Sequence, residues 1–143
     1  SRVGGAAQTK AMKKIAGSLR IDLAQFRELE VFTQFSSDLD PATKEALDHG
    51  NRLVEILKQP LYHPMSVSRQ VVILYAATQK LLAEVPVEHT REAAWGLADY
   101  MRDHCADVME AIDTTGQLSE EGEQAIRQSW ETYKEQVSAT WQA

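Results

Sequence analysis

An arginine close to the start of the chain has the surroundings of a phosphate-binding side chain. Arg2 stands before Val3 and the pair Gly4 and Gly5, and a basic segment containing Lys10 follows. Glycines let the backbone approach a partner closely, and a guanidinium offers a planar, permanently charged fork of donors. In phosphoryl transfer, such a fork neutralises the charge that develops on the phosphate oxygens. By position alone, Arg2 equally fits a solvated charge near a chain end.

A glutamine in the middle of the chain is the second candidate. Gln59 lies at the end of a predicted helix, just before Pro60. Its side-chain amide donates and accepts hydrogen bonds at once, which suits the edge of an adenine. From the residues alone, a polar residue at a helix end is the simpler interpretation. The chain has no GxxxxGK[ST] segment to hold phosphates, so we expect weak or no nucleotide binding by this chain itself.

A short acidic segment, residues 36–40, is the third candidate. Asp38 and Asp40 could meet basic residues of a partner, although acidic loops usually face solvent. Asp40 also precedes Pro41, and Asp before a proline at the first helical position is a typical helix N-cap. We favour the capping role for Asp40.

The histidines and the cysteine do not form a pattern typical of a metal site. His49, His63, His89 and His104 lie in different segments, and no pair has the spacing of four residues that places two ligands on one helix face. Adjacent residues such as His104 and Cys105 point in different directions on a helix. With one cysteine in the chain, an internal disulfide is impossible. No strand-turn-helix elbow presents a serine nucleophile either.

We expect helices to position these residues, because apolar side chains recur at spacings of three and four along most of the chain. No strand-type alternation, internal repeat or low-complexity tract occurs. The sequence therefore predicts an all-α fold, a compact bundle of about six to seven short helices, with the three tryptophans as core or interface anchors. The predicted buried faces are Leu19, Leu23, Phe26, Leu29 and Phe32; Ala42, Ala46, Gly50, Leu53, Val54 and Leu57; Val67, Val71, Leu74, Tyr75, Thr78, Leu81 and Leu82; Ala94, Leu97, Ala98 and Met101; Cys105, Val108, Met109 and Ile112; and Ile126, Trp130, Tyr133 and Val137.

Caps and breakers predict where these helices begin and end. Gly17 and Ser18 are expected to end a short first helix and to cap the next one. The apolar run 71–77 could be a buried strand, but its continuation favours a helix buried on most sides. Further boundaries are expected at Asp40, Pro60, Pro64, Ser66, Pro86, Gly116 and Ser119.

Composition excludes several classes of protein. The 143 residues are 43% hydrophobic and 25% charged, which is ordinary for a soluble domain. The longest apolar run is far shorter than the roughly 20 residues that span a bilayer. The net charge of −6 argues against a nucleic-acid binder, since only residues 1–35 carry a basic excess, six Lys or Arg against three Asp or Glu.

Four sequence blocks follow one another within residues 1–85. They are SRVGGAAQT at 1–9, LAQFRE at 23–28, QFSSDLD at 34–40, and LKQ at 57–59 followed by Tyr62 and Pro64-Met65. In order and spacing these blocks resemble the C-terminal part of the alpha subunit of F-type ATP synthases. From about residue 86 the resemblance is looser and rests on Pro86-Val87, the Thr115-Gly116 turn and the overall length.

The resemblance implies roles for the candidate residues. Arg2 takes the place of the arginine that reaches the catalytic site on the neighbouring beta subunit, an arginine finger. Gln59 takes the place of a glutamine that lies against the adenine at the non-catalytic nucleotide site. Leu61 stands where the family often has a second glutamine, which puts part of that adenine contact in doubt. The segment with Asp38 and Asp40 is implied to lie near the central rotating stalk.

The resemblance also implies the organisation of the protein. Residues 1–16 would end the nucleotide-binding domain, and residues 17–143 would form the C-terminal helical domain. The full subunit would bind ATP or ADP with Mg, whereas this chain alone is expected to bind none and to be inactive. The implied activity is ATP synthesis coupled to hydrogen ion transport, in the CF(1) part of the complex. That part is peripheral to the membrane, on the cytoplasmic side in bacteria and on the matrix or stroma side in organelles.

The implied partners are the beta subunits, the gamma central stalk and the delta or peripheral stalk, with neither nucleic acid nor direct membrane insertion. Exposed ring-facing surface is compatible with self-association of the protein. Two other hypotheses stay open. A free-standing helical interaction module fits composition and periodicity equally well, and a start codon just ahead of Ser1 would favour it. A regulator that binds an anionic surface through Lys10, Lys13 and Lys14 has weaker support.

Overall fold

The computed structural model describes residues 10–34, 39–58 and 66–141, and within these ranges it contains six α-helices, two 3-10 helices and no strand. This result confirms the predicted all-α bundle. In chain order the elements are α2 (Lys10–Thr33), α3 (Pro41–Leu57), α4 (Val67–Thr78), η1 (Leu81–Glu84), η2 (Val87–His89), α5 (Thr90–His104), α6 (Ala106–Thr115) and α7 (Glu120–Trp141).

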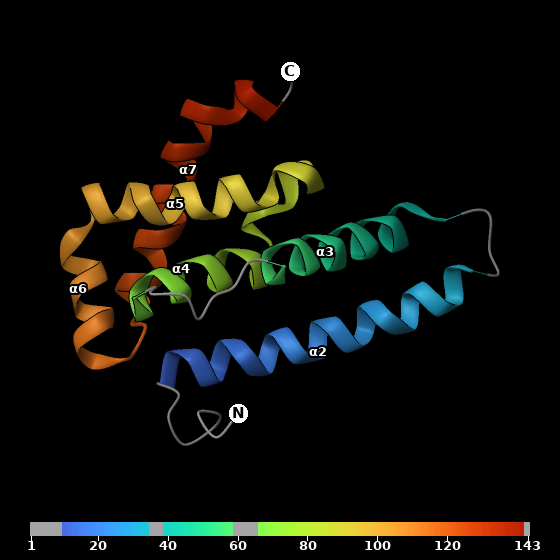
Figure 1. Ribbon diagram of the computed structural model, residues 1–143, viewed down its shortest axis with the longest axis horizontal. Helices are drawn as coiled ribbons and strands as arrows, with labels where there is room; N and C mark the ends of the chain where they lie inside the picture. The colour runs from blue at the N-terminus through green and yellow to red at the C-terminus, as the bar shows by residue number, and fades with distance from the viewer. Residues whose placement is uncertain (1–9, 35–38, 59–65, 142–143) are drawn as a thin grey trace.

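The helices surround α4. Helices α2 and α3 form an antiparallel pair along one side of the molecule, and both pack against α4 (Figure 1). Helix α5 packs on α4 as well, and α6 lies at one end of the bundle. Helix α7 packs across α5 and α6. The far end of the α2–α3 pair extends beyond α4 toward the right of the figure.

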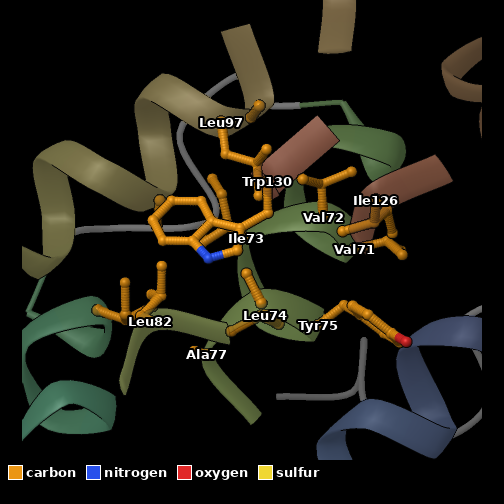
Figure 2. Packing of buried hydrophobic residues seen from close by; sticks show 14 of the residues in the cluster. Val71, Val72, Ile73, Leu74, Tyr75, Ala77, Leu82, Leu97, Ile126 and Trp130 are labelled. Atoms are coloured by element: carbon orange, nitrogen blue, oxygen red, sulfur yellow. The ribbon is translucent and has the colours of Figure 1, made fainter. Parts of the chain in front are cut away.

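Helix α4 is the centre of the core. All its residues from Val71 to Thr78 are buried, so no side of the second half of this helix faces solvent. Figure 2 shows Leu97 of α5 and Trp130 of α7 on one side of α4, and the hydroxyl of Tyr75 directed toward α2 on the other. A helix that is apolar all round is expected to be buried on all sides. The prediction of a buried helix here, in place of a strand, is therefore confirmed.

The predicted caps are also confirmed. The side chains of Asp40, Ser66 and Ser119 each accept a hydrogen bond from the backbone N–H three residues further on. Gly116 ends α6 in the left-handed conformation, with a φ of 69°. These contacts satisfy helix-end donors that have no partner within the helix.

The predicted break at Gly17 and Ser18 is wrong, because α2 runs through both residues without interruption. A glycine within a helix costs about 1 kcal/mol relative to alanine. Packing offsets this cost, since Ala11 and Ile15 are buried before the glycine and Phe26 is buried after it. The division of the chain at residue 17 into two domains stays a prediction.

The predicted faces of α2 and α3 are partly wrong near their ends. Phe32 is 63% exposed, and Ala42 and Ala46 are exposed as well. Phe32 and Ala42 belong to the last turn of α2 and the first turn of α3, at the end of the pair that extends past α4 (Figure 1). Ala46 lies one turn further along α3 and lines a cavity together with Ala77 of α4 and Leu82 of η1. At the other end of α3, the predicted core residue Leu57 is 39% exposed. Its neighbour Ile56 is buried in its place.

Helix α4 also ends earlier than predicted. It stops at Thr78, and Lys80 adopts a left-handed conformation with a φ of 62°. The backbone then forms η1, in which Leu82 is buried at 1% exposure. Leu82 thus reaches the core from a separate short helix and not as a continuation of α4.

Candidate functional site

Most residues with a predicted functional role lie outside the described ranges. This applies to Arg2, to Asp38, and to Gln59 with the neighbouring Leu61. Their roles stay predictions. Asp40 is described, and so are the helices that lead to the undescribed segments on either side of α3.

Asp40 occupies the capping position at the start of α3. Its Oδ1 accepts a hydrogen bond of 2.8 Å from the backbone N–H of Thr43. Hydrogen bonding by Thr43, first from its side chain and then from its backbone, lowers the pKa of Asp40. The carboxylate is exposed, but its oxygen is engaged by its own helix. The capping role that the sequence favoured is therefore confirmed.

Helices α2 and α3 form a close hairpin because of one glycine. A Cβ added to Gly50 would lie 2.0 Å from Cδ1 of Phe26, so the bare glycine backbone makes room for this buried ring. A polar contact adds to the pairing, since His49 Nε2 lies 3.2 Å from Asp22 Oδ2. The ring of Phe26, packed against the backbone of Gly50, thus holds the two helices of the α2–α3 hairpin together.

The end of this hairpin carries an exposed apolar surface, which we call the hairpin tip. It comprises Val31, Phe32 and Leu39, with exposed fractions of 59%, 63% and 39%. Val31 and Phe32 lie in the last turn of α2, and Leu39 lies just ahead of α3, at the end of the helix pair that extends past α4 (Figure 1). Large apolar side chains that stay exposed near one end of a protein can contribute to an interaction surface. The sequence did not predict this surface, because Phe32 continues the spacing of the buried stripe, although Val31 beside that stripe was a usable signal.

The opposite end of α3, just before Gln59, is fixed to the bundle. Arg52 Nε donates a hydrogen bond of 2.9 Å to the backbone oxygen of Val85, and burial lowers the pKa of Arg52. One turn later, Lys58 Nζ lies 2.6 Å from Glu55 Oε2, and this hydrogen bond lowers the pKa of Glu55. The helix end that leads to the predicted adenine contact is therefore well anchored.

No group of three or more histidine, cysteine or carboxylate side chains that could hold a metal occurs among the described residues. The ring of His104 lies 4.2 Å from that of Tyr100, centroid to centroid. Cys105, at the junction of α5 and α6, has its Sγ 3.4 Å from Ser129 Oγ of α7. These side chains thus serve helix packing.

The predicted role of the tryptophans as anchors is confirmed. Trp130 is 1% exposed, and Trp141 stacks on it with a centroid distance of 5.8 Å. Trp95 packs against the same core.

Within the described ranges, no helix combines the length and the apolar character needed to cross a bilayer.

A polar cluster between α4 and α7 was not predicted. The Tyr75 hydroxyl donates to Glu123 Oε1 at 3.1 Å and accepts from Arg127 Nε at 3.1 Å. The guanidinium also lies 5.5 Å from the centroid of the Tyr75 ring. Burial raises the pKa of Tyr75. The sequence placed Tyr75 on a buried face, but nothing in it could identify partners that lie about 50 residues away.

Comparison with known proteins gives consistent matches. The family model described as ATP synthase alpha/beta chain, C terminal domain, matches residues 8–133. The ATP synthase subunit alpha of Rickettsia bellii is 49% identical over 133 residues, which are 93% of this chain and 26% of that protein. The subunit alpha of Streptococcus pyogenes serotype M49 is 58% identical over 121 residues, 85% of this chain and 24% of that protein. The chain thus spans about a quarter of the length of these relatives, and the family match continues well past residue 86, where the motif resemblance was looser.

Proposed function

This protein belongs to the family of C-terminal domains of ATP synthase alpha and beta subunits, and we propose that it serves in the alpha subunit of a complex that makes ATP from ADP and phosphate. The observation that carries the proposal is the combination of this family match with the Ser1-Arg2-Val3-Gly4 motif. The relatives from Rickettsia bellii and Streptococcus pyogenes are alpha subunits, which supports a regulatory role over a catalytic one. The energy source would be the flow of hydrogen ions through the complex.

Arg2 is the residue through which this subunit would take part in the chemistry. We assign it the role of an arginine finger that reaches the catalytic site of a neighbouring beta subunit. A guanidinium there would stabilise the charge that builds on the phosphoryl oxygens in the transition state. Arginine fingers in other phosphoryl-transfer enzymes raise the rate by about a thousandfold or more.

The hairpin tip supports a contact with the rotating stalk. Val31, Phe32 and Leu39 are exposed at the end of a hairpin that extends past the rest of the bundle, so the tip could touch a partner that the bundle does not reach. The acidic segment with Asp38 lies between them in the sequence and would add charge complementarity to a basic stalk surface. The gamma subunit is the partner that we propose for this surface.

We also propose a nucleotide contact for Gln59. In the full subunit, Gln59 would contact the adenine of a bound ATP or ADP with Mg, with Leu61 in place of a second polar contact. Arg52 supports this placement because it anchors the helix that ends just before Gln59. The chain alone would be inactive, since it has no phosphate-binding loop. The partners would be beta, gamma and the delta or peripheral stalk, on the cytoplasmic side of a bacterial membrane or its organellar equivalent.

The experiment that tests the finger is a set of arginine variants in the full alpha subunit, assembled with beta and gamma. Arg2→Ala should lower multi-site ATP turnover by about a thousandfold with assembly intact. Arg2→Lys should restore little, because an ammonium lacks the planar fork. Arg20→Ala, which removes an exposed arginine from α2, is the matched control and should leave turnover unchanged. Unchanged turnover in Arg2→Ala would refute the proposed role.

The contact with the stalk needs a separate test. Val31→Ser with Phe32→Ser removes apolar surface from the tip and should weaken binding of gamma to the assembled ring. The same change at Ile21, which is 61% exposed but lies in the middle of α2, should have little effect. Equal binding of gamma by the tip variant and the unchanged protein would contradict the proposed contact.

A further inference from the structure

A cavity of about 380 Å³ opens beside the first half of α2, away from both the hairpin tip and the end of α3. It lies between α2, the end of α4, and the turn that joins α6 to α7. Ala11, Ile15 and Leu118 give it an apolar lining, and Tyr75 contributes from α4. The backbone N–H of Ala11 donates a hydrogen bond of 3.1 Å to the oxygen of Gly116, which fixes α2 to the turn at this place.

The charges around the cavity favour an anion. Lys10 and Lys14 line it from one turn of α2, both are exposed, and neither forms an ion pair with a described residue. Among the described residues of the lining, Glu123 is the one carboxylate. This carboxylate is already engaged by the Tyr75 hydroxyl, which in turn accepts from Arg127. The lining therefore has a basic excess in a protein whose net charge is −6.

The polar groups and the size narrow the class of ligand further. The side-chain amides of Gln79 and Gln117 line the cavity and supply neutral donors and acceptors. A volume of this size is near the lower end of the range of small-molecule sites, about 300–1,000 Å³. It has room for a medium alkyl group or two fused rings. Such sites are mainly apolar, with a few polar groups that fix the orientation of the ligand.

We propose that this cavity binds a small amphipathic monoanion, an apolar body that carries one carboxylate or sulfonate. The apolar body would lie against Ala11, Ile15 and Leu118, and the anionic group would lie between the ammonium groups of Lys10 and Lys14. Burial of the apolar body would supply most of the affinity. The two lysines would supply the preference for an anion over an uncharged molecule of the same shape. Inorganic phosphate, which has no apolar body, would not bind here.

The test is a titration of the 143-residue protein with 8-anilinonaphthalene-1-sulfonate, followed by fluorescence and by amide shifts in nuclear magnetic resonance spectra. We expect saturable binding of one dye molecule per protein molecule, with the largest amide shifts around Ala11, Leu118 and Gln79. Decanoate should displace the dye, decanol should displace it less well, and phosphate should not displace it. Equal competition by decanol and decanoate would refute the role of the anionic group.

Charge variants on α2 give the matched comparison. Lys14→Gln should weaken dye binding by about two- to fivefold, and Lys10→Gln together with Lys14→Gln by about tenfold. Lys13→Gln removes the same charge from a neighbouring residue that does not line the cavity, and it should leave the affinity unchanged. Equal weakening by Lys13→Gln would overturn the proposal, since it would indicate a general charge effect.

The hairpin tip is the main competing site for an apolar dye. A variant with Val31→Ser and Phe32→Ser should bind the dye as well as the unchanged protein does, because these residues are remote from the cavity lining. Loss of binding in this variant, or amide shifts that cluster at the tip, would overturn the proposal. Loss of the near-ultraviolet circular dichroism signal on adding the dye would overturn it too, since the dye would then report loosened packing.

Discussion

Replacement of Gly50 by alanine should destabilise the protein, although alanine is the better helix former. In a helix, Gly→Ala stabilises by about 1 kcal/mol when the new methyl group meets nothing. At Gly50 the new Cβ would lie 2.0 Å from Cδ1, 2.3 Å from Cγ and 2.7 Å from Cβ of Phe26. Ordinary contact begins at 3.4 Å, so Cδ1 alone would have to move by about 1.4 Å.

A rotation of the Phe26 ring cannot remove this clash. The Cβ of Phe26 is itself too close, and it is fixed to the backbone of α2, so the two helices must separate. Overpacking of this kind costs about 1–3 kcal/mol. After the propensity gain of about 1 kcal/mol is subtracted, we expect Gly50→Ala to lower the free energy of unfolding by about 0–2 kcal/mol.

Gly17 is the matched control, since it lies in α2 and a Cβ added there meets nothing within 4 Å. Gly17→Ala should raise the free energy of unfolding by about 1 kcal/mol. The two variants should therefore differ by about 1–3 kcal/mol in urea unfolding followed by far-ultraviolet circular dichroism. With Phe26→Ala as background, Gly50→Ala should cost less than it does with the ring present, because Cδ1 and Cγ are gone and only the close contact of 2.7 Å with the Cβ of residue 26 remains. Equal stabilisation by both alanines would refute the close packing of α2 on α3.

Three further predictions concern the cap, the polar cluster and the core. Asp40→Ala should lower the urea midpoint, whereas Asp40→Asn should nearly keep it, because asparagine caps as well as aspartate. The pKa of Asp40 lies below its ordinary value of 3.8, so the ionised cap stabilises the protein at neutral pH, and this contribution is lost as the pH falls below about 4. In acid titrations, Asp40→Asn should therefore lose less stability over this pH range than the unchanged protein does. Tyr75→Phe should lower the free energy of unfolding by about 1 kcal/mol in urea. Because burial raises the pKa of Tyr75 above its ordinary value of 10.0, the unchanged protein should lose stability as the pH rises above that value, and Tyr75→Phe should lose less. Trp130→Ala should cost about 3–5 kcal/mol, whereas Trp95→Ala, at a partly exposed position, should cost clearly less.

Local chemistry determined which parts of the fold could be predicted. The caps at Asp40, Ser66 and Ser119 depend on residues three positions apart, so the sequence alone contains the whole interaction. The burial of α4 follows likewise from its unbroken apolar composition. The continuity of α2 through Gly17 was not predictable by these rules, because it depends on packing against helices that lie further along the sequence.

The same distinction applies to the functional residues. Phe26 and Phe32 belong to one stripe of α2 by spacing, yet the first is 6% exposed and the second 63%. Periodicity gives the face of a helix, but it does not tell how far along that face the neighbouring helices extend. The motif around Arg2 could be recognised because a resemblance needs only the order of residues. Its geometry could not be predicted, since the arginine finger that we propose would act on a site that another subunit supplies.

The positions of core and tip indicate that stability and the proposed partner contact are separable in this domain. The buried side chains gather around α4, whereas Val31 and Phe32 lie at the end of a hairpin that extends beyond it. An apolar residue that stays exposed contributes little to folding, since the unfolded protein exposes it too. Natural sequences tend to avoid such patches because they promote association. The exposed side chains of the tip therefore agree with the contact that we propose for it, and Phe26 packed on Gly50 fixes the two helices that carry the tip against each other.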